Sequence, residues 1–125
     1  MKHEIWLIED DEYLVELTKS VLERRGYLVR TFLSGQEALT AMNEELPNLV
    51  VMDNLLPDQS GSEICRLMKS NPETRHIPIL LTTGQMYWEE IEREPDDMIK
   101  PDDYLIKPFE VEDLLEKIQE LLSSS

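Results

Sequence analysis

Four short apolar runs of this chain each end in side chains suited to phosphoryl chemistry. Run 5–8 leads into Glu9, Asp10 and Asp11, run 49–52 into Asp53, run 79–81 into Thr82 and Thr83, and run 104–106 into Lys107 and Pro108. In an open parallel sheet covered on both faces, strands are continuous apolar runs, and ligands bind beyond their carboxyl ends. The sequence therefore predicts that carboxylates, a hydroxyl and an ammonium group converge at one edge of a sheet.

Carboxylates placed close together repel one another, which favours a bound cation. A hard divalent cation such as Mg²⁺ takes oxygen ligands and relieves that repulsion while it keeps exchangeable waters. A lone aspartate after a strand is usually a turn or capping residue, so the case for Asp53 depends on the residues expected beside it. The pattern indicates a metal site with a spare carboxylate.

Charge and composition exclude several classes of function. The 125 residues include 27 acidic and 12 basic side chains, for a formal charge of −15, which disfavours nonspecific binding to nucleic acid or to an anionic membrane. The single cysteine, Cys65, cannot form an internal disulfide and suits a reducing compartment. No apolar stretch approaches the roughly 18 residues that span a bilayer, and the first residues do not resemble a signal peptide. We expect a cytoplasmic protein.

Strand-like and helix-like patterns alternate along the chain without a linker or a repeat. This alternation predicts five βα units and a doubly wound, three-layer α/β fold in a single domain over residues 1–125. The pattern places a second strand over 27–32, a fourth over 77–82 and the last helix from about Glu110. The serines at 123–125 are expected to form a tail or the start of a linker.

The chain resembles a known family in four stretches that occur in the expected order over residues 4–122. The stretches are IWLIEDD (5–11), VVMD (50–53) with LP (56–57) and SG (60–61), IPILLTT (77–83) and DDYLIKPF (102–109). They are similar to the receiver domains of two-component response regulators, of which the chemotaxis regulators are one kind. The resemblance implies a flavodoxin-like αβα sandwich whose five-stranded parallel sheet has the strand order 2-1-3-4-5.

The resemblance also implies roles for individual residues. Asp53 corresponds to the aspartate that accepts a phosphoryl group from a phosphohistidine. Glu9 and Asp10 correspond to residues that hold Mg²⁺ together with Asp53 and the backbone carbonyl of Leu55. Mg²⁺ is thus the implied cofactor and Asp53 the phosphorylation site.

Three further residues match the family's switch. The resemblance implies that Lys107 contacts the phosphate, that Thr83 is the switch hydroxyl and that Tyr104 is the aromatic residue whose rotamer reports the switch. A carboxylate is a weak nucleophile, so transfer to Asp53 needs in-line placement and charge stabilisation on the phosphoryl oxygens. An ammonium suits one phosphoryl oxygen as a point charge, and a hydroxyl can reorient when the new anion forms. For Tyr104, plain packing is an equal alternative.

The implied function is a phosphoacceptor switch that relays a signal by conformational change. It is a signalling domain that catalyses only its own phosphotransfer and dephosphorylation, not an enzyme acting on other substrates. The implied partners are a sensor histidine kinase or a histidine phosphotransfer protein, and a downstream effector that docks on the face from the fourth to the fifth helix. Direct binding to nucleic acid or membrane is not expected, and a homodimer is left open.

Two other functions compete with this interpretation. A degenerate receiver would act as an unphosphorylated protein-binding module, but such chains usually lose the acidic pair, the aspartate or the lysine, and none is lost here. A Mg²⁺-dependent aspartyl phosphatase of the dehalogenase type would have a second aspartate where Leu55 stands, and its nucleophile would follow the first strand. A flavodoxin is disfavoured because carboxylates after the first strand would repel a flavin phosphate.

Several eye-catching residues have structural explanations. Asp11 is expected to cap the first helix, and Thr82 is expected to be an ordinary β-branched strand residue. Cys65 is expected to be a small, half-buried side chain. His3 and His76 have no partner at a metal-ligand spacing, so both are expected at the surface.

The segment 84–103 departs from the family pattern. A Lys-Pro pair stands where receivers have a Gly-Ala step, and Pro95 and Pro101 forbid one continuous helix. We expect about two helical turns around Trp88, then an irregular acidic stretch and a remodelled output face. Amide exchange over 94–100 is expected to be fast, and Trp88 is expected to sense the switch.

Overall fold

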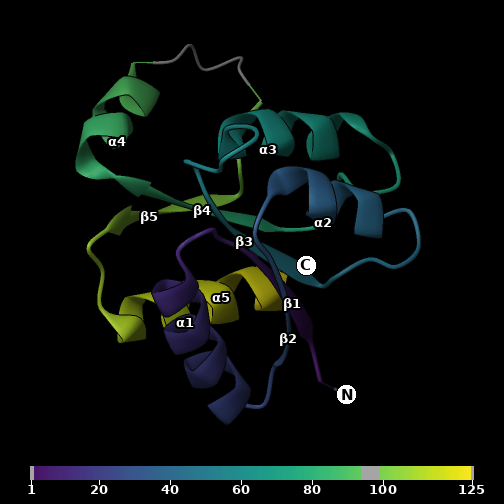
Figure 1. The fold of residues 1–125 in the computed structure, drawn as a ribbon, viewed down its shortest axis with the longest axis vertical. Coiled ribbons are helices and arrows are strands. Elements are labelled where there is room, and N and C mark those ends of the chain that lie inside the picture. The colour runs from purple at the N-terminus through teal and green to yellow at the C-terminus, as the bar shows by residue number, and fades with distance from the viewer. Residues whose placement is uncertain (1, 94–98, 125) are drawn as a thin grey trace.

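The protein folds into a five-stranded parallel sheet of order β2-β1-β3-β4-β5 with helices on both faces (Figure 1). The computed structural model describes residues 2–93 and 99–124. The elements are β1 (Glu4–Ile8), α1 (Glu12–Arg24), β2 (Leu28–Phe32), α2 (Gly35–Ala41), β3 (Leu49–Asp53), α3 (Gly61–Ser70), β4 (Ile79–Gly84), α4 (Gln85–Glu92), β5 (Asp103–Lys107) and α5 (Val111–Ser124). The expected fold class and strand order are confirmed. Within the described ranges, no helix is both long and apolar enough to cross a membrane.

Each central strand is buried on both faces, which explains its continuous apolar sequence. In β1, Ile5 and Leu7 pack with residues of α1 and α5, whereas Trp6 and Ile8 pack with residues of α2 and α3. Figure 1 shows these two helix layers on opposite sides of the sheet. Burying a side chain of this size contributes roughly 1.5–3 kcal/mol, so the two clusters hold the strand ends in fixed positions.

Two core residues illustrate how the helices and the sheet edge pack. Cys65 is completely buried beside Ile64 in α3, so the half-buried position expected for it is wrong. The reason is that the buried face of α3 is wide enough to include two consecutive residues. Trp6 fills the same layer against Phe32, and the guanidinium of Arg30 lies 5.2 Å from the Trp6 ring centroid. His3 and His76 are exposed, as expected.

Three elements have bounds that differ from those read from the sequence. β2 begins at Leu28 and not at residue 27. The fourth strand begins at Ile79 and not at Ile77, because Pro78 has no N–H to donate to the ladder and the Ile77 N–H bonds to the Thr74 carbonyl instead. The strand continues to Gly84, which places Thr83 inside it. The last helix extends through Ser124, and the Ser123 hydroxyl donates to the Gln119 carbonyl within it.

α4 has eight residues, which agrees with the two turns expected there. The acidic stretch that follows, residues 94–98, lies outside the described residues, and so does most of the segment for which fast exchange is expected. Beyond it, Asp102 anchors the start of β5. Its carboxylate accepts hydrogen bonds from the Ile79 N–H at 2.7 Å and the Lys69 ammonium at 2.8 Å, and its own N–H donates to the Ile79 carbonyl at 2.9 Å.

Candidate functional site

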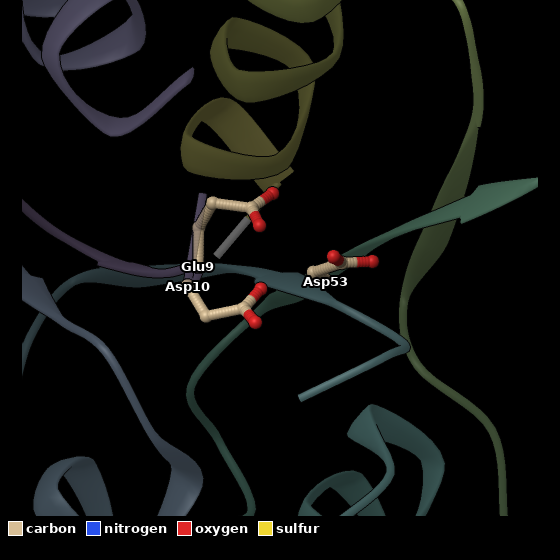
Figure 2. A group of neighbouring side chains, drawn as sticks. All are labelled: Glu9, Asp10 and Asp53. Atoms are coloured by element: carbon tan, nitrogen blue, oxygen red, sulfur yellow. The ribbon is translucent and has the colours of Figure 1, made fainter. Parts of the chain in front are cut away.

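Three carboxylates meet at the carboxyl ends of two neighbouring strands. Glu9 and Asp10 directly follow β1, and Asp53 is the last residue of β3, which pairs with β1 in parallel. One carboxylate oxygen from each of the three residues lies within 4.8 Å of the others. Figure 2 shows the side chains of Glu9 and Asp10 reaching toward the side on which Asp53 lies. The structure therefore brings together the three carboxylates that the sequence places at this edge of the sheet.

Lys107, the last residue of β5, supplies the cation of the cluster. Its ammonium lies 3.1 Å from a Glu9 carboxylate oxygen and 3.3 Å from an Asp53 carboxylate oxygen. Burial alone would lower the pKa of Lys107, but the charges of Asp53 and Glu9 outweigh it and raise this pKa above its usual value. Lys107 is therefore fully charged at neutral pH and bridges the two carboxylates.

Glu9 is the most buried member of the cluster. Only 4% of its side chain is exposed, and one carboxylate oxygen accepts a hydrogen bond from the Asp11 N–H at 3.2 Å. Burial and the neighbouring Asp53 carboxylate raise the pKa of Glu9, although the hydrogen bond from Lys107 acts in the opposite direction. The surroundings of Glu9 thus disfavour its ionised form when no cation besides Lys107 is present.

This set of donors fits a hard divalent cation. Three carboxylates face one ammonium, and Asp10 is exposed to solvent, so the cluster keeps excess negative charge and an open side. Oxygen ligands with an open side suit a cation that retains part of its hydration shell. The arrangement could therefore hold a metal ion between the ends of β1 and β3.

The loop after β3 is closed tightly against the end of the strand. The Leu55 N–H donates to the Asp53 carboxylate at 3.2 Å, and Leu55 forms a β-bridge with Ser60. Gly61 packs so closely that a Cβ there would lie 2.7 Å from the Asp53 carbonyl oxygen. The side-chain carbonyl of Asn54 accepts hydrogen bonds from the N–H and the hydroxyl of Ser62, both at 3.1 Å. These contacts fix the backbone around Asp53 and Leu55.

Two neighbouring threonines of β4 occupy different surroundings. Thr82 lines a cavity of about 10 Å³ together with Glu9, Asp53 and Lys107, and its hydroxyl donates to the Met52 carbonyl at 3.4 Å. Thr83 is only 1% exposed, and its hydroxyl has no hydrogen-bond partner among the described residues. A buried hydroxyl without a partner is rare in proteins. The Thr83 hydroxyl is therefore a buried polar group whose hydrogen bonding is incomplete.

Tyr104 lies in β5, half-buried, and makes an edge-to-face contact with Trp88 of α4 at a centroid distance of 5.1 Å. Both rings line a surface groove of about 590 Å³ between β5 and α5. Four acidic residues also line this groove: Asp103, Asp113, Glu116 and Glu120. Its one lysine, Lys117, is paired with Asp103 at 3.1 Å. The groove is thus lined by apolar and acidic side chains together.

One tertiary contact of the loop after β3 is not evident from the sequence. Asp58, in the loop after β3, accepts hydrogen bonds from two N–H groups of the first turn of α2. The turn-forming composition of 54–61 predicts a loop there but gives no sign of its partner. Asp11, by contrast, caps α1 as expected, because its side chain accepts from the N–H groups of Tyr13 and Leu14.

Comparison with known proteins agrees with this geometry. The sequence model of the response regulator receiver domain matches residues 5–119. The phosphate regulon transcriptional regulatory protein PhoB of Rhizobium meliloti is 38% identical over 122 residues, which cover 98% of this chain and 53% of that protein. The polar-differentiation response regulator DivK of Brucella ovis is 31% identical over 125 residues, with complete coverage of both chains. The chain spans about half the length of the transcriptional regulators it matches.

Solved structures show the same likeness. A putative response regulator from Chloroflexus aurantiacus superposes with a TM-score of 0.86 at 31% identity and covers 98% of this chain and 99% of its own. The signal receiver domain of a signal transduction histidine kinase from Syntrophus aciditrophicus gives a TM-score of 0.89 at 30% identity, covering 98% and 91%. The chain therefore belongs to the family of response regulator receiver domains of two-component systems.

Proposed function

We propose that this receiver domain accepts a phosphoryl group on Asp53 and relays the signal through a conformational switch. The observation that carries the proposal is the cluster itself. Asp53 is the last residue of β3. Its carboxylate lies beside two further carboxylates and 3.3 Å from the Lys107 ammonium. A carboxylate held next to a fixed cation can receive a phosphoryl group whose negative charge that cation stabilises.

The proposed transfer is an in-line displacement at phosphorus. An oxygen of Asp53 forms the new O–P bond as the N–P bond of a phosphohistidine breaks, and the imidazole leaves with the electron pair. Lys107 contacts an oxygen of the transferred group as a point charge. The closed loop after β3 fixes the attacking carboxylate, since the Leu55 N–H holds one of its oxygens. The domain thus catalyses only its own phosphorylation and the later hydrolysis.

The proposed cofactor is Mg²⁺, held by Glu9, Asp10, Asp53 and the backbone carbonyl of Leu55. When bound, the ion would neutralise charge on the carboxylates and on the phosphoryl oxygens. Asp10 is exposed and can adjust its position, whereas Glu9 is buried and fixed by Lys107 and the Asp11 N–H. Glu9 would therefore be a preformed ligand of the ion, and Asp10 an adjustable one.

The proposed switch begins at Thr83. Its buried, unpartnered hydroxyl gains a hydrogen-bond acceptor when a phosphoryl group is added to the neighbouring strand end. Movement of this side chain changes the space available to Tyr104, which contacts Trp88 in α4. A charge added at Asp53 is thereby converted into a packing change on the surface of α4 and β5.

Receiver domains act with histidine kinases and downstream effectors. For this chain we assign the donor role to a histidine kinase or a histidine phosphotransfer protein, and the output surface to α4, β5 and α5. The acidic residues that line the groove there favour a partner with basic residues and disfavour a second copy of this chain. Residues 1–125 are assigned to one receiver domain that acts in the cytoplasm.

Phosphorylation with a small donor tests the acceptor. Acetyl phosphate with Mg²⁺ is expected to add one phosphoryl group to the wild type and none to Asp53→Ala, as measured by intact-protein mass spectrometry. Glu112→Ala, which removes an exposed carboxylate from α5 outside the groove, serves as the control and should be phosphorylated normally. Equal phosphorylation of wild type and Asp53→Ala would exclude the proposed acceptor. A wild type that stays unmodified would favour the unphosphorylated binding module instead.

A metal titration tests the cofactor. Asp10→Asn removes one negative charge from an exposed position and is expected to weaken Mg²⁺ binding at least tenfold, or about 1.4 kcal/mol. The titration can be followed through amide chemical shifts at the ends of β1 and β3. An unchanged affinity would remove Asp10 from the proposed ligands.

A further inference from the structure

Asp58 connects the loop that follows Asp53 and carries Leu55 to a different part of the fold. One of its carboxylate oxygens accepts the Gly35 N–H at 3.1 Å, and the other accepts the Gln36 N–H at 2.9 Å. Burial acts in the opposite direction, but these N–H groups hold the pKa of Asp58 below its usual value. The carboxylate is therefore ionised at neutral pH and makes two charge-assisted hydrogen bonds to the first turn of α2.

The absence of a side chain at Gly35 lets the first turn of α2 pack closely against α3. A Cβ at Gly35 would overlap with the side chain of Ile64 in α3. The first turn of α2 also has a cap of its own, since the Ser34 hydroxyl accepts the Glu37 N–H at 3.3 Å. Asp58 is thus an additional contact from another loop and not the residue that starts the helix.

The segment that leads into α2 is bonded to the other half of the candidate metal site. The Phe32 carbonyl, at the end of β2, accepts the Glu9 N–H at 3.0 Å. Glu9 is therefore bonded to the end of β2, just before α2 begins. Leu55 lies in the loop after Asp53, and Asp58 fastens that loop to the first turn of α2. The contact from Asp58 thus links this loop to Glu9 and Asp10 through the β2–α2 connection.

We propose that Asp58 is a positioning residue that holds Leu55 and the rest of the loop after Asp53 in place relative to Glu9 and Asp10, and so sets the affinity for the divalent cation. This inference rests on the proposed Mg²⁺ site. Without Asp58, the loop keeps its contacts through Asn54, Gly61 and the packing of Leu56 on the core, but loses its hydrogen bonds to α2. The ligands on the two sides would then have to be brought into place by the ion itself, which weakens binding.

The test compares two variants that remove hydrogen bonds to the first turn of α2, two of them in Asp58→Ala and one in Ser34→Ala. Asp58→Ala removes the contact between loop and helix. Ser34→Ala removes the cap of the same helix but leaves that contact in place. Mg²⁺ affinity is measured by amide chemical-shift titration of the unphosphorylated proteins, and stability by urea unfolding without Mg²⁺. We expect Asp58→Ala to weaken Mg²⁺ binding about tenfold, which is the lower end of the range of effects for residues that support metal ligands. Ser34→Ala should leave the Mg²⁺ affinity unchanged.

A third variant, Asp58→Asn, keeps one acceptor oxygen and should give an intermediate affinity; it also serves if Asp58→Ala does not fold. Equal weakening by Asp58→Ala and Ser34→Ala would overturn the inference, because the effect would then follow helix stability. Wild-type affinity in both Asp58 variants would overturn it as well. If the wild type shows no saturable Mg²⁺ binding that Asp53→Ala abolishes, the proposed metal site fails, and the inference fails with it.

Discussion

Replacing Lys107 with methionine should destabilise the metal-free protein, because the carboxylates of Glu9 and Asp53 then lose their cationic partner. The ammonium contacts Glu9 at 3.1 Å and Asp53 at 3.3 Å. At an effective dielectric constant of about 20, each contact has a gross Coulomb energy of about 5 kcal/mol, most of which the cost of desolvation offsets. Removing one partner of a buried ion pair typically costs about 3–5 kcal/mol. Because 28% of the Lys107 side chain is exposed, we expect a loss of about 2–3 kcal/mol at pH 7.

The pH dependence of this loss follows from Glu9. Burial and Asp53 already raise the pKa of Glu9 above its ordinary value of 4.5, and removing Lys107 raises this pKa further. Between the unfolded and the folded pKa, the folded protein binds more protons, so its stability falls as the pH rises. The cost of Lys107→Met is therefore fully present above the folded pKa of Glu9 and disappears as the pH falls toward 4.5.

Urea unfolding of metal-free protein from pH 4.5 to pH 8 measures both quantities. Lys117→Met is the matched control, since it removes the same charge from a more exposed pair with Asp103 and should cost less than about 1 kcal/mol. Added Mg²⁺ should restore more stability to Lys107→Met than it adds to the wild type, because the ion replaces the missing cation. If Lys107→Met lost no more unfolding free energy than Lys117→Met, and if that loss did not depend on pH, this account of the cluster would be refuted.

Beryllofluoride with Mg²⁺ should change the fluorescence of Trp88, and the change should be lost in Thr83→Ala; an identical change in that variant would exclude Thr83 as the start of the switch. The Cys65 thiol is buried and its pKa is raised to about 11, so iodoacetamide at pH 8 should label it only in urea, and rapid labelling of the folded protein would contradict its buried position. Gly61→Ala places a Cβ 2.7 Å from the Asp53 carbonyl oxygen and should cost about 1–3 kcal/mol in urea unfolding, whereas a stability equal to the wild type would show that this backbone yields freely.

The sheet and the members of the cluster could be predicted because both depend on local sequence. Strands buried on two faces must be apolar throughout, and a polar residue at the end of such a run lies at the carboxyl edge of the sheet. That rule alone brings Glu9, Asp53 and Lys107 together, as the structure shows. The strand order came from the family resemblance, since the apolar runs do not tell which strands are neighbours.

The remaining features depend on contacts between distant segments. Asp58 and Gly35 are 23 positions apart, and only the packing of α2 against α3 brings them together. The sequence also gives no sign that Ile77 is buried in a turn before the strand begins, because apolar residues occur on both sides of Pro78. Complete burial of Cys65 likewise depends on how α3 lies on the sheet. Such features need the tertiary structure.

The anchoring of Asp102 has a consequence for engineering. Its carboxylate and its N–H fasten the beginning of β5 to Ile79 of β4, and Lys69 adds a bond from the end of α3. Within the described residues, β4 and α3 therefore hold β5 in position, and with it Lys107 at its end. We therefore expect the connection from α4 to accept an inserted peptide, such as an epitope or a spectroscopic tag, without moving Lys107 away from Glu9 and Asp53.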